Sequence, residues 1–150
     1  MKGDIIKYVS FYDATLNDSS KSINALVPEI GNGHPWQLLF AHVVLTSSAA
    51  VGNRLMSISL QDADSNVIMD IHAGSLQAAS LAYHYELMQG VYRESINTTA
   101  VPTGIDGTIQ MPIAQDFIVQ PGQTLIIEDA RAIAAAADDM TVSGTIAVLR

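Results

Sequence analysis

The sequence contains no cysteine among its 150 residues, which excludes a disulfide framework, a thiol nucleophile and a zinc–thiolate site. Basic residues are scarce: 7 Lys and Arg, scattered singly, stand against 15 Asp and Glu and give a net charge of −8. Proteins that bind nucleic acid or anionic lipid need grouped basic side chains, so we expect neither partner. The longest stretch without a charged residue, 30–53, is interrupted by Asn, His, Gln and Ser and lacks the ~20 consecutive apolar residues of a membrane span.

An apolar export signal is also missing from the first residues. Lys2, Asp4, Lys7 and Asp13 stand where its apolar core would lie, so we expect synthesis in the cytoplasm. A single domain of this length buries about two-thirds of the surface of its unfolded chain and folds without disulfides.

Charged side chains of either sign are few. Only 15% of residues are charged, against about 25% in an average protein, while 49% are hydrophobic. The protein therefore has more apolar surface than its polar residues can cover, and subunit interfaces usually cover such surface. We expect a homo-oligomer or a component of a larger assembly.

The sequence is rich in apolar residues that alternate with polar ones at period two, the pattern of half-buried strands. In residues 54–61, for example, Met56, Ile58 and Leu60 alternate with serine and glutamine. Turn residues separate the strands at regular intervals, which indicates an all-β, antiparallel two-sheet β-sandwich, jelly-roll-like or barrel-shaped, with about eight strands. The predicted strands are 23–30, 36–46, 54–61, 67–71, 81–87, 108–113, 125–129 and 140–149.

Two segments fall outside this pattern. Residues 1–22 are predicted to form an N-terminal arm, which leaves 23–150 as a single sandwich domain. Residues 130–137 are rich in alanine and long enough for about two helical turns, so we expect a short helical crossover that ends at Asp138 and Asp139.

Acidic residues form two patterns with a possible chemical role. Asp62, Asp64 and Asn66 match the first positions of a calcium loop, but the glycine and the final glutamate of that loop are absent, so a hairpin turn is favoured. The adjacent Asp138 and Asp139 are an alternative carboxylate pair for glycoside hydrolysis, but neighbouring residues on a strand point to opposite faces.

Histidines are the other candidates for a chemical centre. If strands 66–72 and 80–87 pair as a hairpin, the side chains of Asp70, His72, His84 and Glu86 share one outward face, a possible set of ligands for a divalent metal. The tight His-x-His spacing of metal-binding cupins is absent, and an exposed polar face is favoured. Since no G-x-S-x-G motif or ordered triad is present either, we expect no catalytic residue, no metal, no cofactor and no enzymatic activity.

Aromatic residues are few, and their positions suggest where a partner would bind. Tyr8, Phe11 and Tyr12 stand close together in an otherwise polar arm and are predicted to contact a partner; an extra edge strand that closes the sandwich is the alternative. His34 and Trp36, the only tryptophan, flank a proline after a glycine-rich turn and form a possible ligand-binding loop.

Three stretches resemble small tailed-bacteriophage virion proteins. The C-terminal stretch VQPGQTLIIEDARAIAAAADDMTVSGTIAV has their Pro-Gly turn, acidic strand end, Ala-rich crossover, Asp-Asp-Met and last strand. RLMSISLQDADSNVIMDIHAG is similar to their strand–turn–strand pattern, and GSLQAASLAYHY to the entry of the next strand. The resemblance covers about residues 36–150 and rests on structural rather than catalytic motifs.

This resemblance implies a jelly-roll structural protein of a bacteriophage virion. Such a subunit acts as a capsid decoration or cement protein, often as a homotrimer, and stabilises the head by binding across capsomer junctions. Its partners would be the major capsid protein or other virion proteins, and its location the capsid surface after synthesis in the host cytoplasm. Some proteins of this kind belong to head fibres or tails instead.

Two other functions stay open. A carbohydrate- or receptor-binding jelly-roll module of a head fibre or tail would use the loop of His34 and Trp36, or Tyr92 with Arg93 and Glu94. A metal-dependent enzyme on a cupin-like barrel would use the histidines described above.

Overall fold

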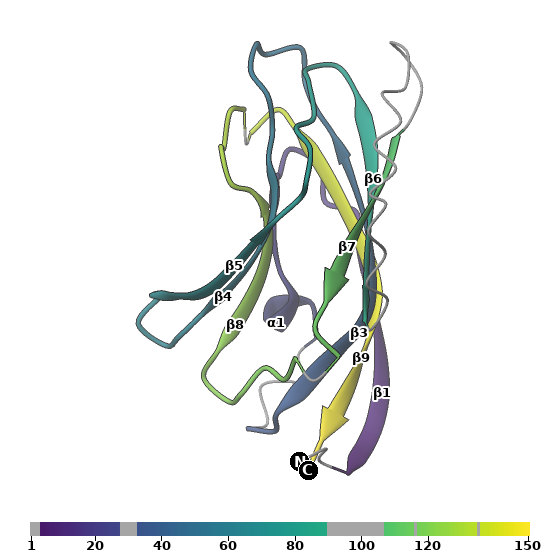
Figure 1. The fold of residues 1–150 in the computed structure, drawn as a ribbon, viewed down its shortest axis with the longest axis vertical. Helices are drawn as coiled ribbons and strands as arrows, with labels where there is room; N and C mark the ends of the chain where they lie inside the picture. Colours follow the sequence, from purple (N-terminus) through teal and green to yellow (C-terminus); the bar gives the residue numbers. More distant parts are fainter. Residues whose placement is uncertain (1–3, 28–32, 90–106, 116, 135) are drawn as a thin grey trace.

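The computed structural model describes residues 4–27, 33–89, 107–115, 117–134 and 136–150, and most of these residues lie in β-strands. The strands form two sheets that face each other (Figure 1), so the predicted all-β, two-sheet sandwich is confirmed. In spatial order, the five-stranded sheet contains β1 (Ile5–Asp13), β9 (Asp139–Leu149), β3 (Trp36–Thr46), β6 (Ala82–Gln89) and β7 (Gly107–Ile113). The four-stranded sheet contains β2 (Ser20–Ser22), β8 (Thr124–Asp129), β4 (Met56–Gln61) and β5 (Val67–His72).

The strand pairings are nested. β1 pairs with β9, β2 with β8, β3 with β6 and β4 with β5, all antiparallel. The exception to antiparallel pairing is β7, which lies parallel to β6 at the edge of the five-stranded sheet and carries Pro112. Proline is tolerated in an edge strand because its missing N–H leaves no ladder bond unmade when it faces away from the neighbouring strand.

The core lies between the sheets and follows from the period-two pattern. In β3 the side chains of Trp36, Leu38, Ala41, Val43 and Leu45 are buried, and an irregularity between Leu38 and Phe40 keeps them on one face. Met56, Ile58 and Leu60 of β4 face them from the other sheet. Each fully buried aliphatic side chain of this kind stabilises the fold by about 1.5–3 kcal/mol relative to an exposed one.

The first predicted strand, 23–30, is wrong over its described part. Residues Ile23–Leu26 form α1, a single helical turn that lies between β8 and the five-stranded sheet (Figure 1), with Ile23 fully buried. Asn24 explains this placement, because its side chain donates to the carbonyl of Gln123 (2.9 Å) and accepts from the amide of Leu125 (3.1 Å) at the start of β8. A short apolar run does not by itself distinguish a strand from a buried helical turn.

The predicted helical crossover over 130–137 is also wrong. Residues 130–134 and 136–138 form turns instead. Asp129 organises them, since its Oδ1 accepts hydrogen bonds from the amides of Leu55 (2.9 Å) and Arg131 (3.1 Å). Ala132 then takes a positive φ of 47°, which is incompatible with a right-handed helix.

Residues 5–13 do not form a free arm. They form β1, the edge strand of the five-stranded sheet, and residues 20–22 form β2, which pairs with β8. The sequence leaves two interpretations open for the segment of Tyr8, Phe11 and Tyr12: a partner-binding arm or an extra edge strand. In the structure this segment is an edge strand.

Candidate functional site

The outer surface of the five-stranded sheet exposes apolar side chains that could contact a partner. We call it the outer five-strand face: the side chains of β1, β9, β3, β6 and β7 that point away from the core. Its apolar members include Tyr8 and Tyr12, which are 63% and 73% exposed, and Phe40 and Met88, which are 39% and 40% exposed. By strand alternation and register the face includes Tyr8, Ser10, Tyr12, Gln37, Phe40, His42, Val44, Thr46, Ala82, His84, Glu86, Met88, Thr108, Gln110, Pro112, Asp139, Thr141, Ser143, Thr145 and Ala147, of which Ala147 is fully covered by its neighbours.

This face carries little charge, since Glu86 and Asp139, at the start of β9, are the ionic side chains in that set. The sequence of β3 is apolar on both sides, a pattern typical of a strand that is buried on both sides. The structure buries only one side and leaves Phe40 exposed on the other. Apolar residues at the outward positions of β3 and β6 were therefore the signal that sequence reasoning missed.

Two histidines stack within this face. The Nε2 atom of His42 lies 3.0 Å from the Nδ1 atom of His84, and the ring centroids are 5.2 Å apart with an angle of 20° between the ring planes. The predicted hairpin of strands 66–72 and 80–87 is wrong, because β5 pairs with β4 and β6 with β3. His72 and His84 consequently belong to different sheets, and the described residues contain no cluster of three or more potential metal ligands.

The edge strand β1 has a defined orientation of its backbone. The amide of Leu149 donates to the carbonyl of Pro35, on the side of β3. The amide of Arg150 donates to the carbonyl of Asp4, on the side of β1. Since amide directions alternate along a strand, the even-numbered residues of β9 bond to β1, and their partners in β1 are the odd-numbered ones. The N–H and C=O groups of Tyr8, Ser10 and Tyr12 therefore point away from the sheet.

Of the three aromatic residues predicted to contact a partner, Phe11 lies on a different side of β1 from Tyr8 and Tyr12. Phe11 is buried against Gly144 and belongs to the core, so an exposed contact role does not fit it. Tyr8 and Tyr12 lie on the opposite side of β1 and are exposed. Their role in partner binding stays a prediction.

A pocket of about 230 Å³ lies beside His34, at the turn that precedes β8. His34 is exposed at this pocket, whereas Trp36 is buried in the core and its backbone pairs with Val119. The indole of Trp36 is thus not available to stack on a ligand, which corrects its predicted role. The pocket is lined by Asn24, Gly33, His34, Gln120, Pro121, Gly122, Gln123 and Thr124. The alternative sugar site at Tyr92, Arg93 and Glu94 lies outside the described residues.

A second polar cluster lies on the outer side of the four-stranded sheet. Asp70 accepts a short hydrogen bond from the hydroxyl of Ser57 through Oδ1, and its Oδ2 lies 2.8 Å from Nε2 of His72. Glu128 is paired with Ser57 across the sheet; its partial burial, with the negative charges of Asp70 and Asp129, raises the pKa of its carboxyl. The carboxylate of Asp70 lies between Ser57 and His72, so His72 cannot take the proton of Ser57 directly, as the histidine of a hydrolase triad does.

The Asp62–Asn66 segment forms a turn between β4 and β5. Oδ1 of Asp62 accepts the amides of Asp64 and Asn66, both at 2.9 Å, and its Oδ2 accepts from the side chain of Asn66 at 3.0 Å. The side-chain and backbone hydrogen bonds from Asn66 lower the pKa of Asp62. This carboxylate closes its own hairpin, as the turn interpretation predicted.

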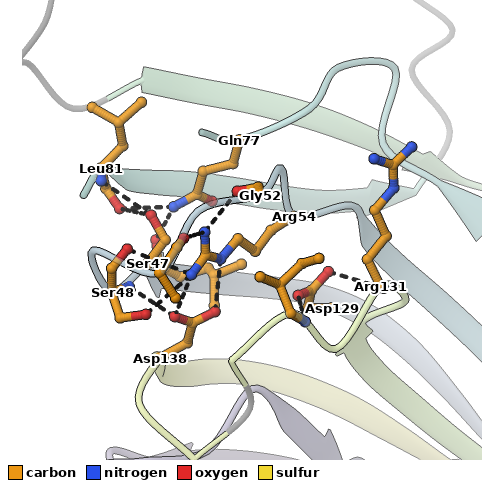
Figure 2. Close-up of polar contacts among 12 residues, drawn as sticks. Ser47, Ser48, Gly52, Arg54, Gln77, Leu81, Asp129, Arg131 and Asp138 are labelled. Atoms are coloured by element: carbon orange, nitrogen blue, oxygen red, sulfur yellow. Dashed lines mark hydrogen bonds and ion pairs between the residues drawn. The ribbon is translucent and has the colours of Figure 1, made fainter. Parts of the chain in front are cut away.

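The most completely buried polar group is an ion pair at one end of the sandwich (Figure 2). Nε of Arg54 donates to Oδ2 of Asp138 and Nη2 donates to Oδ1, both at 2.9 Å, and neither side chain is exposed. Arg54 also donates from Nη1 to the carbonyls of Ala50 (2.9 Å) and Gly52 (2.7 Å). The ion pair joins the β3–β4 connection to the segment before β9.

Gln77 extends this network to the β5–β6 connection. Its Nε2 donates to the carbonyls of Leu45 (2.7 Å) and Leu81 (2.8 Å), and its Oε1 accepts from the hydroxyl of Tyr85 (2.9 Å). Asp138 is thus a structural residue, and Asp139 accepts the amide of Asn17 at 2.7 Å. A carboxylate held by a buried arginine is unsuited to the acid–base work of a glycosidase pair.

Comparisons with known proteins leave the family of this chain open. No protein-family model and no curated protein matches the sequence. Among solved structures, one similar chain comes from the structure of infectious bursal disease virus, Gx strain, with a TM-score of 0.33 and 13% sequence identity. The match covers 96% of this chain and 32% of that one, so the present chain spans about a third of its length. None of the helices in the described residues has the length and apolar character needed to cross a membrane.

Proposed function

We propose that this protein is a structural, non-enzymatic subunit of a bacteriophage virion that decorates the capsid and stabilises it across capsomer junctions. The observation that carries the proposal is the outer five-strand face, where exposed Tyr8, Tyr12, Phe40 and Met88 lie on a surface with little charge. A face of this kind gains free energy when a neighbouring protein covers it. Many weak, symmetric contacts of this type add up to firm attachment to a particle.

The connectivity supports the jelly-roll class that the sequence predicts. When β7 is set aside, the nested pairs β1–β9, β2–β8, β3–β6 and β4–β5 are those of one long hairpin rolled into two four-stranded sheets. This connectivity is found in viral capsid and lectin domains alike, so the choice between a structural and a ligand-binding function depends on the surface.

The polar clusters favour a structural protein over an enzyme. The ion pair of Arg54 and Asp138 is fully buried, and Asp62 closes its own turn. In the cluster of Ser57, Asp70 and His72, the order of the hydrogen bonds does not suit proton transfer from serine to histidine. We accordingly propose no enzymatic activity, the major capsid protein or other virion proteins as partners, and a location on the capsid surface.

The test is whether the protein belongs to virus particles. Virions purified by density gradient from the producing culture should contain the protein in a fixed ratio to the major capsid protein, measured by quantitative mass spectrometry. Particles that lack it should bind the recombinant protein, and the double variant Tyr8→Ser/Tyr12→Ser should bind at least about tenfold more weakly. Val51→Ser is the matched control, because Val51 is exposed but lies in a loop away from the face. Protein found only in the particle-free fraction would contradict the proposal.

The pocket beside His34 favours a second candidate, a carbohydrate- or receptor-binding module of a head fibre or tail. Its lining offers the side-chain amide of Gln120 and the hydroxyl of Thr124, which suit the hydroxyls of a sugar, whereas the side chain of Asn24 already binds the backbone at the start of β8. Specific binding on a glycan array that is lost in the variant His34→Ala would support this function. An array without any bound glycan would remove it.

A further inference from the structure

The edge strand β1 is unusually open to pairing with another strand. It is nine residues long and contains no proline. After a bulge between Ile5 and Lys7 it pairs regularly from Lys7 to Asp13, and β9 is its only partner among the described residues (Figure 1). Exposed edges in natural sheets are usually shortened, interrupted or charged, because a row of unpaired N–H and C=O groups recruits other strands. The edge strand at the other side of this sheet, β7, has Pro112, and β2 in the four-stranded sheet has only three residues.

We propose that β1 pairs with β1 of a second copy of this chain, antiparallel and about a two-fold axis through Ser10. The two five-stranded sheets then continue into each other and form one sheet across the dimer. An axis of this kind makes the same surface serve both subunits, the usual arrangement of homodimers.

The register follows from the directions of the backbone groups. The outward N–H and C=O groups belong to the even-numbered residues, so these residues must face even-numbered residues of the partner copy. A two-fold axis therefore passes through a residue and not between two residues. With Ser10 on the axis, Tyr8 faces Tyr12 of the second copy in a hydrogen-bonded pair, and Val9 faces Phe11 in the next pair.

Charge complementarity selects Ser10 over its neighbours as the centre. In this register Lys7 faces Asp13 of the second copy, once on each side of the axis, whereas an axis through Val9 or Phe11 would place each charge opposite an uncharged residue. Asp13 already shares Lys21 with Asp18, each with an oxygen 3.1 Å from Nζ of Lys21, so this cluster has a net charge of −1. Within the described residues Lys7 forms no ion pair. The second copy thus supplies the missing cation, in a position where cross-strand pairs of opposite charge stabilise a sheet.

Dimer formation leaves the outer five-strand face open and doubles it. The new contacts use the edge of β1, while Tyr8 and Tyr12 of both copies remain on the same side of the joined sheet and stack across it. The inference does not depend on the virion role, because it concerns the purified protein alone. It differs from the homotrimer that the sequence resemblance implies, and the stoichiometry distinguishes the two.

The first experiment compares two substitutions at the axis. Ser10→Pro removes an N–H that the five-stranded sheet does not use and places a ring on the rim of β1, so the fold is retained while the edge is blocked. Ser10→Ala keeps the N–H and removes only the hydroxyl that lies 3.2 Å from Oγ1 of Thr145. By sedimentation equilibrium and native mass spectrometry we expect a dimer for the wild type and for Ser10→Ala. The dissociation constant of Ser10→Pro should rise about tenfold or more, with an unchanged circular dichroism spectrum.

Two further variants test the register and keep the proposal falsifiable if Ser10→Pro fails to fold. Lys7→Glu places a carboxylate opposite Asp13 of the other copy and should weaken the dimer, less so at high salt. Ser10→Cys introduces the only cysteine of the chain, and paired strands bring the two Cα atoms to about 5.5 Å, within the range for a disulfide. It should cross-link rapidly on oxidation, while Val51→Cys, exposed in a loop, should not.

Three results would overturn the inference. They are a wild type that stays monomeric or forms a trimer, a folded Ser10→Pro variant that dimerises as well as the wild type, and equal cross-linking of the two cysteine variants. Binding of the protein to virus particles has no bearing on these outcomes, so a failure of either proposal is recognised separately.

Discussion

At the scale of single residues, the fold depends on a few polar side chains that are fully enclosed. An arginine and a carboxylate without solvent exposure are costly to bury, and they are tolerated when each has a complete set of partners. Arg54 and Asp138 meet this condition through each other, the carbonyls of Ala50 and Gly52, and the amide of Ser48 (Figure 2). Together with Gln77 they fix three connections that contain no regular secondary structure.

Substitution of Asp138 by asparagine tests this role. The variant Asp138→Asn leaves the guanidinium of Arg54 buried without a counter-charge, and the free energy of unfolding should fall by about 3–5 kcal/mol. Urea denaturation measures the change. Asp64→Asn, at an exposed turn position, is the control and should change stability by less than about 0.5 kcal/mol. A loss in Asp138→Asn as small as that of the control would mean that the ion pair is not structural.

Gly144 is required by close packing. A Cβ atom at this position would lie 2.6 Å from Cζ of Phe11 and would also clash with the carbonyl oxygen of Phe40. Because the second contact is with backbone, the strand itself must shift, and Gly144→Ala should destabilise the protein by about 1–3 kcal/mol. Thermal unfolding should show a lower midpoint for this variant and little change for Ser143→Ala, the outward-facing neighbour. An unchanged midpoint in Gly144→Ala would show that β1 does not pack as described.

The period-two alternation of a strand already predicts that the aromatic residues near the N-terminus lie on two different faces. On any strand Tyr8 and Tyr12 share one face while Phe11 points to the other, so their different exposure follows once residues 5–13 form a strand. Sequence reasoning treated this segment as an arm, and the distinction was lost. Trp36 was misplaced for a related reason: a lone tryptophan beside a loop suggests a ligand site, but its neighbours Leu38 and Ala41 share its inward face.

At the scale of elements, β1 is integral to the sandwich. Deletion of residues 1–13 would remove Phe11 from the core and turn β9, now paired on both sides, into an edge strand. Loss of a buried phenylalanine alone costs about 3–5 kcal/mol, so the truncated protein should unfold at a much lower temperature or fail to fold. Thermal unfolding followed by circular dichroism measures this.

The point variants provide the comparison for that deletion. Tyr8→Ser/Tyr12→Ser alters only exposed side chains and should unfold within a few degrees of the wild type. If the truncated protein instead unfolds at the wild-type temperature, residues 1–13 form an independent arm, as the sequence first indicated.

Strand positions were largely predictable, whereas strand pairing was not. β3, β6, β7 and β9 lie within one or two residues of their predicted ranges, because period-two alternation is a local property of the sequence. Pairing depends on contacts between distant segments, and strands that follow each other were assumed to form hairpins. β5 and β6 instead belong to different sheets, and this error produced the proposed group of His72, His84 and Glu86. The alanine-rich segment failed for another reason: helix propensity is weak and was overridden by the hydrogen bonds of Asp129.

At the scale of the whole molecule, stability should depend on pH in two steps. Burial raises the pKa of Glu128, so the folded state binds this proton more tightly than the unfolded state, and acidification from neutral pH through its raised pKa should stabilise the fold slightly. Burial alone would raise the pKa of Asp138 too, but hydrogen bonds from Arg54 and Ser48 outweigh it and lower that pKa. Hydrogen bonds from Thr15 likewise lower the pKa of Asp13. The stability these two carboxylates contribute is present above the ordinary aspartate pKa of about 3.9 and is lost as pH falls through that value towards their folded pKa values.

Urea denaturation across a pH series measures both steps. The free energy of unfolding should reach its maximum in mildly acidic solution and fall steeply below about pH 4. Glu128→Gln should abolish the rise and leave the fall in place. If the free energy of unfolding of Glu128→Gln still rises on acidification, another titrating group is responsible for the rise.

The nested pairing has a consequence for the order of events during synthesis. β1 leaves the ribosome first, but its partner β9 is complete only when residue 149 has been added, so hydrogen bonds such as that between Ser10 and Thr145 span 135 positions. Until then β1 is an apolar strand that is unpaired along both of its edges. The local hairpin of β4 and β5 can already form during this time. Folds dominated by such distant contacts are slow to form. The interval between the emergence of the two strands is therefore the period in which the growing chain is most exposed to aggregation and most in need of a chaperone.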